Sequence, residues 1–121
     1  MDPESYFSSD YQAARAKFLS ACEAAAAAVE SYENPHTGPD GAPLFTDVCT
    51  IGGREADTVL TLCSGTHGVE GFAGSALQTG FLLEGVTTWL PHDVRLVMIH
   101  ALNPYGFAHV RRVNEDNVDL N

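Results

Sequence analysis

The stretch LTLCSGTHGVEGFAGSALQ, residues 60–78, decides the fold. Its apolar run stops at Ser64-Gly65, glycines then recur at every third residue up to Gly74, and a helical pattern follows. This order predicts a strand, a tight turn and the start of a helix. In open α/β sheets, ligands bind in the crevice at the carboxyl ends of the strands, where such a turn lies.

An imidazole and a carboxylate stand within this turn, at His67 and Glu70. Both groups are good zinc ligands, and a catalytic zinc takes three protein ligands and a water. Residues three apart on a helical turn face the same way, so the pair can point at one ion. Taken alone the pattern is weak, because a capping glutamate and a partly exposed histidine fit it as well.

The glycines do not match the common nucleotide-binding patterns. A phosphate-binding loop requires G-x-x-x-x-G-K-[ST] and a dinucleotide fingerprint requires G-x-G-x-x-G, whereas here the spacing is three and no lysine follows. The serine-hydrolase elbow G-x-S-x-G is absent as well. These absences leave a metal or structural role for the turn.

Two later motifs strengthen the metal hypothesis: N-P-Y-G at residues 103–106 and RVNEDNVDLN at residues 112–121. The order H-x-x-E, N-P-x-G and R-x-N…D-L-N resembles the zinc carboxypeptidase superfamily. The THGVEGFAGSA motif is similar to one bacterial branch of it, and the chain looks like the N-terminal part of such a protein. The resemblance covers roughly residues 45–121 and raises the expectation of a metal site.

The resemblance implies a role for each matching residue. His67 and Glu70 match the first two zinc ligands, and Arg112 matches the arginine that polarises the scissile carbonyl and stabilises the oxyanion. Arg111 could take that role, but the R-x-N spacing favours Arg112. Asn121 matches the asparagine that helps to hold the terminal carboxylate of the substrate. The third zinc ligand, a histidine, and the catalytic glutamate are expected downstream of this chain.

The expected function is therefore zinc-dependent hydrolysis of an amide bond in a peptide or an acylated amino acid, like that of a metallocarboxypeptidase. One alternative is a zinc deacylase resembling aspartoacylase and succinylglutamate desuccinylase, which share H-x-x-E and D-L-N-R. The N-P-x-G turn favours the carboxypeptidase side. A second alternative is a non-catalytic binding module of the same fold. The third ligand and the catalytic glutamate would decide between an enzyme and a binding module.

Composition limits the class of protein and of partner. The chain has 121 residues, enough for one small domain, and 45% of them are hydrophobic. Its net charge of -10 argues against nucleic acid and anionic membranes as partners. No signal peptide or membrane span is visible. The widely spaced Cys22, Cys49 and Cys63 are expected to be buried free thiols in the reducing cytoplasm.

The remaining patterns predict an α/β fold with a mixed or parallel sheet and helices on both faces, like phosphorylase/hydrolase-like zinc peptidases. Residues 1–44 are expected to form a helix and a Pro/Gly-rich loop on the same domain as residues 45–121. Asp10 is the predicted N-cap of the first helix, and one helical face recurs at Tyr11, Ala14, Phe18, Ala21 and Cys22. The predicted elements are helices over 10–32 and 71–83, strands over 45–51, 57–63 and 94–101, and a loop over 34–43.

The other histidines receive separate expectations. His36 is predicted to be a solvated loop residue and His92 an exposed one, whereas His100 is predicted to lie in the core or behind the site. His109 is expected near the site without binding the metal. Because the chain ends inside a motif and leaves an apolar sheet edge open, the isolated segment is expected to bind zinc weakly, to lack activity and to aggregate.

Overall fold

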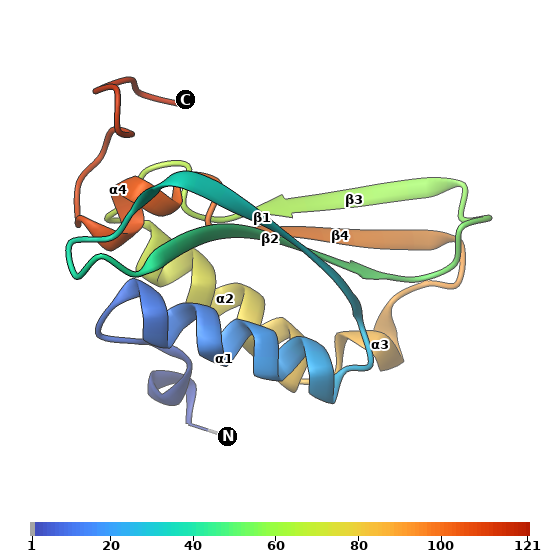
Figure 1. Cartoon of the computed structure of the whole chain (residues 1–121). Coiled ribbons are helices and arrows are strands. Elements are labelled where there is room, and N and C mark those ends of the chain that lie inside the picture. The colour runs from blue at the N-terminus through green and yellow to red at the C-terminus, as the bar shows by residue number, and fades with distance from the viewer. Residues whose placement is uncertain (1) are drawn as a thin grey trace.

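The two strands on either side of the glycine-rich turn and its helix are neighbours in the sheet (Figure 1). In the computed structural model, which describes residues 2–121, β3 (Thr58–Cys63) runs parallel to β4 (Val94–His100). The connection between them contains α2 (Gly71–Leu83) and the short α3 (Val86–Trp89). The predicted strand–helix–strand crossover is confirmed, and α2 has the predicted bounds.

Two antiparallel strands complete the sheet. β2 (Pro43–Ile51) pairs antiparallel with β4, and β1 (Ala28–Thr37) pairs antiparallel with β2. The strand order is β1-β2-β4-β3, with a register shift between Glu33 and Thr37. The sheet is therefore mixed, and the predicted α/β class is confirmed.

The first helix is shorter than predicted. α1 (Tyr11–Ala24) ends inside the alanine run, and Ala26 adopts a left-handed conformation with φ of 53°. The next residues enter β1, because pairing with β2 outweighs the helix propensity of alanine. The predicted helix over 25–32 and half of the predicted loop over 34–43 are therefore wrong, because only residues 38–42 lie between the two strands.

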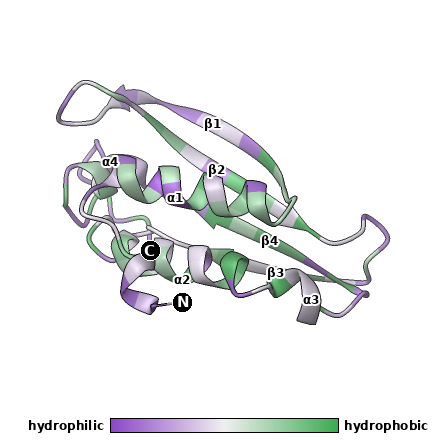
Figure 2. Cartoon of the chain, turned by 90° about the horizontal axis from the view of Figure 1, so that it is seen from below, coloured by the Kyte–Doolittle hydropathy of each residue, from purple (hydrophilic) through white to green (hydrophobic). Residues whose placement is uncertain are grey.

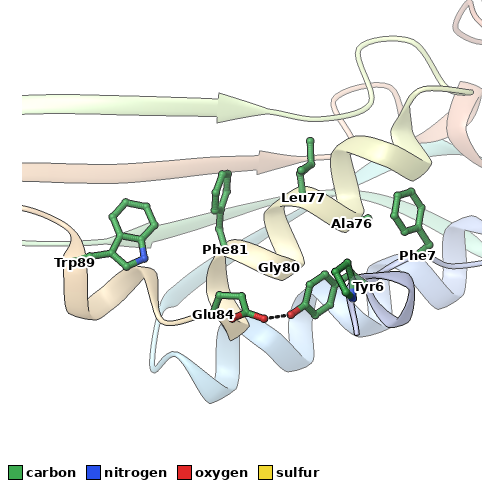
Figure 3. A pocket seen from close by; sticks show the side chains of 9 residues that line it. Tyr6, Phe7, Ala76, Leu77, Gly80, Phe81, Glu84 and Trp89 are labelled. Carbon is green, nitrogen blue, oxygen red and sulfur yellow. Dashed lines mark hydrogen bonds between the residues drawn. The ribbon is translucent and has the colours of Figure 1, made fainter. Parts of the chain in front are cut away.

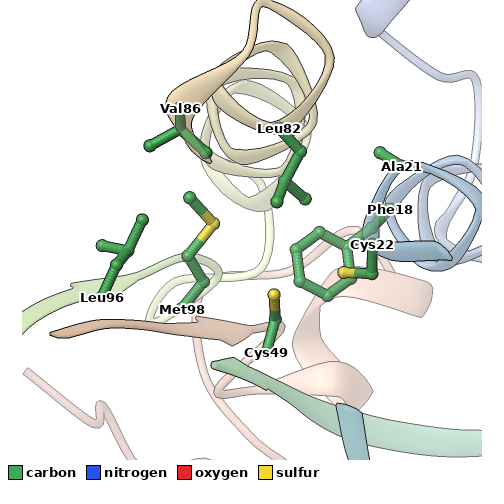
Figure 4. Packing of buried hydrophobic residues seen from close by; sticks show 8 residues of the cluster. All are labelled: Phe18, Ala21, Cys22, Cys49, Leu82, Val86, Leu96 and Met98. Atoms are coloured by element: carbon green, nitrogen blue, oxygen red, sulfur yellow. The ribbon is translucent and has the colours of Figure 1, made fainter. Parts of the chain in front are cut away.

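The core lies between α1, α2 and the sheet (Figure 4). Asp10 caps α1 by accepting a hydrogen bond from the Ala13 N–H at 2.8 Å, as predicted. The buried face of α1 is the predicted one, and one cluster joins it to α2, α3, β2 and β4: Phe18, Ala21, Cys22, Cys49, Leu82, Val86, Leu96 and Met98. Burial of this apolar face explains why α1 packs here.

Both long helices lie on the same face of the sheet (Figure 1). The second helical layer that the sequence predicts for the opposite face is not among residues 2–121.

The hydropathy of the strands differs, since β1 is mostly hydrophilic and β4 mostly hydrophobic (Figure 2). The edge strand β3 was predicted to be buried, but Val59 and Leu60 are 58% and 46% exposed. Within the described residues, no helix is long and apolar enough to cross a bilayer.

His100 is fully buried at the end of β4, as predicted. Its ring stacks on Phe18 with centroids 4.4 Å apart, and its Nε2 lies 2.8 Å from the hydroxyl oxygen of Ser75. Burial lowers the pKa of His100 from 6.5 to about 4, although nearby Asp47 acts in the opposite direction. The folded protein therefore holds this imidazole neutral.

The stability of the fold should fall in acid because His100 must be neutral. Its pKa is lower in the folded state, so the stabilisation is complete above pH 6.5 and is lost as pH falls from 6.5 toward 4. We expect the free energy of unfolding to fall by about 2 kcal/mol between pH 7 and pH 5 from this group. Urea unfolding of the wild type and His100→Gln at both pH values measures the effect.

The matched control for this experiment is His92→Gln, because His92 is exposed in the loop before β4. It should retain the pH dependence of the wild type, whereas His100→Gln should lose most of it. An equal pH dependence in wild type and His100→Gln would contradict the prediction.

Candidate functional site

The turns that follow β3 and β4 are joined by backbone hydrogen bonds. The Ser64 N–H donates to the Ile99 carbonyl at 2.9 Å, and the Leu102 N–H donates to the Ser64 carbonyl at 2.9 Å. The Asn103 N–H then donates to the carbonyl of Gly65 at 2.8 Å. Because these bonds extend the parallel ladder past the strand ends, the loop with His67 lies beside the loop that begins at Asn103.

The N-P-Y-G motif begins the short helix α4 (Pro104–Ala108). The side-chain oxygen of Asn103 accepts a hydrogen bond from the Gly106 N–H at 2.8 Å, which is an N-cap. Its side-chain nitrogen donates to the Arg112 carbonyl at 3.4 Å. Asn103 thus supports both the structural turn predicted for this motif and the backbone of the predicted catalytic arginine.

Gly68 and Gly106 bring the loop that carries His67 and the helix α4 into backbone contact. A Cβ atom added at Gly68 would overlap the backbone carbonyl of Gly106 and the carbonyl oxygen of Arg111. Only glycine permits so close an approach of two backbones. The glycine at the centre of T-H-G-V-E therefore sets the distance between His67 and the arginine segment.

Gly68→Ala should destabilise the protein and disturb the site. The new methyl group has no free space, so the α4 segment must move, and such overpacking costs about 1–3 kcal/mol. Urea unfolding measures the change. Gly53→Ala is the control, since its Cβ would have only the Glu55 nitrogen, 3.9 Å away, within 4 Å, and its effect should stay within about 0.5 kcal/mol. Equal stability of the two variants would contradict this packing argument.

His67 and Glu70 face one another at the start of α2. The distance from His67 Nδ1 to Glu70 Oε1 is 3.8 Å. Two ligands of a tetrahedral zinc at the usual bond lengths stand about 3.4 Å apart, so a small rotation would bring both within coordination distance. The histidine side chain is 16% exposed and the glutamate 63%, and both sequence-predicted ligands are therefore together and accessible.

Asp119 joins His67 to Arg112, and sequence reasoning had not selected it. One carboxylate oxygen lies 2.8 Å from His67 Nε2, and the other accepts from Arg112 Nε at 2.8 Å. Since a carboxylate only accepts, this contact places the imidazole proton on Nε2 in the neutral ring and leaves Nδ1 toward Glu70. A carboxylate that hydrogen-bonds the second ring nitrogen of a metal-binding histidine is a common arrangement. The aspartate of the D-L-N motif was the sequence signal that could have identified this residue.

The loop over residues 113–118 returns Asp119 to His67. The side-chain oxygen of Asn114 accepts from the Asp116 N–H at 3.0 Å and from the Val118 N–H at 2.9 Å. The asparagine of R-x-N thus folds this loop. The Asn121 backbone N–H, the Arg112 guanidinium and His67 together hold the pKa of Asp119 well below its usual range. Asp119 is consequently an anion between an imidazole and a guanidinium.

The other predicted residues lie at different distances from this centre. Asn121 contacts Asp119 through its backbone N–H at 3.0 Å, and its predicted carboxylate-binding role stays a prediction. His109 stacks on Tyr105, with centroids 4.0 Å apart, and its Nε2 lies 3.1 Å from the Thr37 carbonyl oxygen of β1. His36 is exposed as predicted but lies in β1 and not in a loop. Within residues 2–121, no group of three or more His, Cys, Asp or Glu is placed to hold a metal.

The three cysteines were all expected to be buried. Cys22 and Cys49 are buried free thiols, as predicted, but Cys63 is exposed at the end of the edge strand β3.

An apolar groove of about 420 Å³ lies on α2 (Figure 3), and neither His67 nor Glu70 lines it. Leu77, Phe81 and Trp89 contribute to its wall, and the Tyr6 hydroxyl donates to Glu84 at its edge. The groove is therefore lined by other residues than the His67–Glu70 pair.

The fold is that of zinc-peptidase-like proteins of known structure. A metallo-carboxypeptidase from Burkholderia cenocepacia superposes with a TM-score of 0.60 at 21% identity, covering 88% of this chain and 31% of its own. A Zn-dependent exopeptidase from Parabacteroides distasonis gives 0.54 at 15% identity, covering 90% and 44%. A glutaminyl cyclase from Fimbriiglobus ruber gives 0.51 at 13% identity, covering 70% and 35%. This chain thus spans less than half of each solved chain.

The fold and the loops at its carboxyl edge define the class: an α/β protein with the architecture of metallocarboxypeptidases and Zn exopeptidases. Residues 7–121 match the model of a protein family described as "Protein of unknown function (DUF2817)", and the chain belongs to that family. No curated protein matches the chain.

Proposed function

We propose that the full-length protein is a zinc-dependent hydrolase of amide bonds, similar to a metallocarboxypeptidase. The observation that carries this proposal is the pair of donors, His67 Nδ1 and Glu70 Oε1, 3.8 Å apart at the carboxyl end of β3. Asp119 on the opposite nitrogen of the imidazole supports it, because the neutral ring then presents Nδ1 to a metal. The peptidase-like fold supports the same reaction class.

Each residue of the centre has a distinct proposed task. His67 and Glu70 would hold the zinc, and a third ligand would come from outside the described residues. When bound, zinc supplies Lewis acidity toward a carbonyl oxygen. Asp119 orients His67 and holds Arg112 through Nε, while the arginine side chain remains 57% exposed. Arg112 is thus available to stabilise negative charge on a substrate oxygen.

The proposed substrates are peptides or acylated amino acids that carry a free carboxylate. Arg112 and Asn121 flank Asp119 in sequence, and a guanidinium is well suited to bind a carboxylate or an oxyanion. The strong charge imbalance of the chain, -10, gives no reason to expect an anionic polymer as substrate. Blocked dipeptides with a free C-terminus are therefore the substrates to test first.

Zinc content tests the proposal directly. The full-length protein should contain about one zinc per chain, and His67→Ala should lose most of it because an imidazole donor is removed. Elemental analysis after dialysis measures the content. His92→Ala is the matched control, since this histidine is exposed in a loop before β4 and should leave the zinc content unchanged. Equal zinc in His67→Ala and the wild type would refute the ligand assignment.

A further inference from the structure

The short helix α4 ends at a left-handed residue with a branched side chain, Val110, whose φ is 53°. The Val110 N–H donates to the Phe107 carbonyl at 3.2 Å. The next N–H, that of Arg111, donates to the Gly106 carbonyl at 2.9 Å, which completes the hydrogen-bond pattern of a Schellman helix end. Glycine is the usual residue at this position, because a left-handed conformation strains a β-branched residue. Within residues 2–121, the other non-glycine residues in this conformation have no branch at Cβ: Ala26, Ala101 and Asn117.

Burial does not compensate for the strain at Val110. The residue is 59% exposed and belongs to neither hydrophobic cluster of residues 2–121. The helix α1 ends in the same hydrogen-bond pattern, but there the left-handed residue is Ala26, which carries only a methyl group. Strained backbone conformations persist where the surrounding structure fixes them, and they cluster at functional sites. The branched side chain of Val110 therefore indicates a role other than stability.

The segment that begins at Val110 is fixed against the candidate site. A Cβ atom at Gly68 would lie 2.3 Å from the Arg111 carbonyl oxygen, so this backbone lies directly against the loop that carries His67. The Asn103 side chain donates to the next carbonyl, that of Arg112. Since consecutive Cα atoms are 3.8 Å apart, Val110 lies within about 8 Å of Arg112, measured between Cα atoms.

Other exposed apolar residues adjoin the site residues in sequence. Val69 follows His67 by two positions, and Val118 and Leu120 stand on either side of Asp119. All three are exposed to solvent, as Val110 is. A charged centre with exposed apolar neighbours suits a ligand that combines a carboxylate with an apolar side chain.

We infer that Val110 is a specificity-determining residue of this site, where it contacts an apolar side chain on the substrate residue that carries the free carboxylate. The inference rests on the proposed hydrolase function. Arg112 and Asn121 are the proposed partners of the charged groups of the substrate, and the isopropyl group of Val110 meets its apolar part. Because the backbone around Val110 is already fixed, little conformational entropy is lost when the contact forms. The strain is the cost of holding a branched apolar side chain exposed at this point.

Val110→Gly in the full-length protein should stabilise the fold and weaken substrate binding. Its melting temperature should rise by about 2–4 °C, because glycine adopts the left-handed conformation without strain. The KM for a blocked dipeptide that ends in leucine should rise about 5- to 10-fold with kcat unchanged, since an apolar contact is lost. Ala26→Gly is the matched control, because it relieves the same conformation at the end of α1. It should raise the melting temperature and leave KM unchanged.

Val110→Thr tests the polarity of the contact, because threonine keeps the branch at Cβ and replaces one methyl group by a hydroxyl. The preference for leucine over asparagine at the C-terminal position of the dipeptide should fall by about fivefold. Calorimetric titration with acetyl-leucine and acetyl-asparagine makes the same comparison without turnover. A wild type that prefers acetyl-leucine through Val110 but hydrolyses no dipeptide would refute the hydrolase proposal and support the role of Val110.

Three results would overturn the assignment of Val110. One is a more stable Val110→Gly variant whose KM and affinity for acetyl-leucine equal those of the wild type. Another is a wild type that does not distinguish leucine from asparagine in either measurement. The third is an equal rise of KM in Ala26→Gly, which would trace the effect to the stability of the fold and not to a contact with the substrate.

Discussion

Asp47→Ala should lower the free energy of unfolding by about 3 kcal/mol, because it leaves the half-buried Arg15 guanidinium without its ion-pair partner. Asp47 is 0% exposed on β2, and its carboxylate accepts two hydrogen bonds from Arg15, at 2.7 and 3.0 Å. The Ser31 hydroxyl donates to the same carboxylate. Because the Arg15 side chain is 19% exposed, part of its charge can be rehydrated, and the effect should lie at the lower end for buried pairs.

Urea unfolding compares this variant with Asp57→Ala, which removes an exposed carboxylate before β3 and should change stability by no more than about 0.5 kcal/mol. The double variant Arg15→Met/Asp47→Leu should recover much of the loss, since no unpaired charge then remains. Equal stabilities of Asp47→Ala and Asp57→Ala would show that the pair contributes nothing.

The elements that were predicted correctly are those whose signal is local. The buried face of α1 repeats at helical spacing, and α2 lies between a glycine-rich turn and Gly85, so both follow from short stretches of sequence. β3 and β4 are short runs rich in apolar and β-branched residues. In each case the residues that decide the structure are close in the chain.

The errors lie where a distant partner decides the structure. Ala24 to Ala28 favours a helix by propensity alone, but Ala28 lies opposite Thr50 in the β1–β2 ladder. Arg15 and Asp47 are 32 residues apart, and no spacing rule links them. The exposure of Val59 depends on what covers β3, which its apolar sequence cannot report.

The candidate site also combines a contact that a local sequence pattern predicts with one that depends on residues far apart in the chain. The proximity of His67 and Glu70 follows from a spacing of three at a helix start, and the structure places them together. Asp119 lies 52 residues from His67, and its contact requires the fold of the loop over 113–118. Sequence alone named the arginine, but the carboxylate that connects this arginine to the histidine is a result of the tertiary structure.

Arg112 is the residue of this centre whose removal should affect catalysis most in the proposed reaction. Asp119 holds the arginine through Nε, so the position of the guanidinium is fixed relative to His67. The arginine side chain is 57% exposed, which leaves the rest of the guanidinium open to a ligand. Arg111 points elsewhere, since its Nη2 donates to Asn117 at 3.2 Å and its guanidinium lies 5.8 Å from the Tyr105 ring centre.

Arg112→Ala in the full-length protein should lower kcat by roughly 10²- to 10³-fold, the scale for one donor that stabilises charge on a reacting oxygen. Steady-state hydrolysis of a blocked dipeptide with a free C-terminus measures it. The zinc content should remain that of the wild type, because Arg112 is not a proposed ligand. Arg111→Ala is the control and should retain most of the activity. A large loss in Arg111→Ala with none in Arg112→Ala would mean that the neighbouring arginine stabilises the oxyanion, and that the Asp119 bridge does not mark the catalytic one.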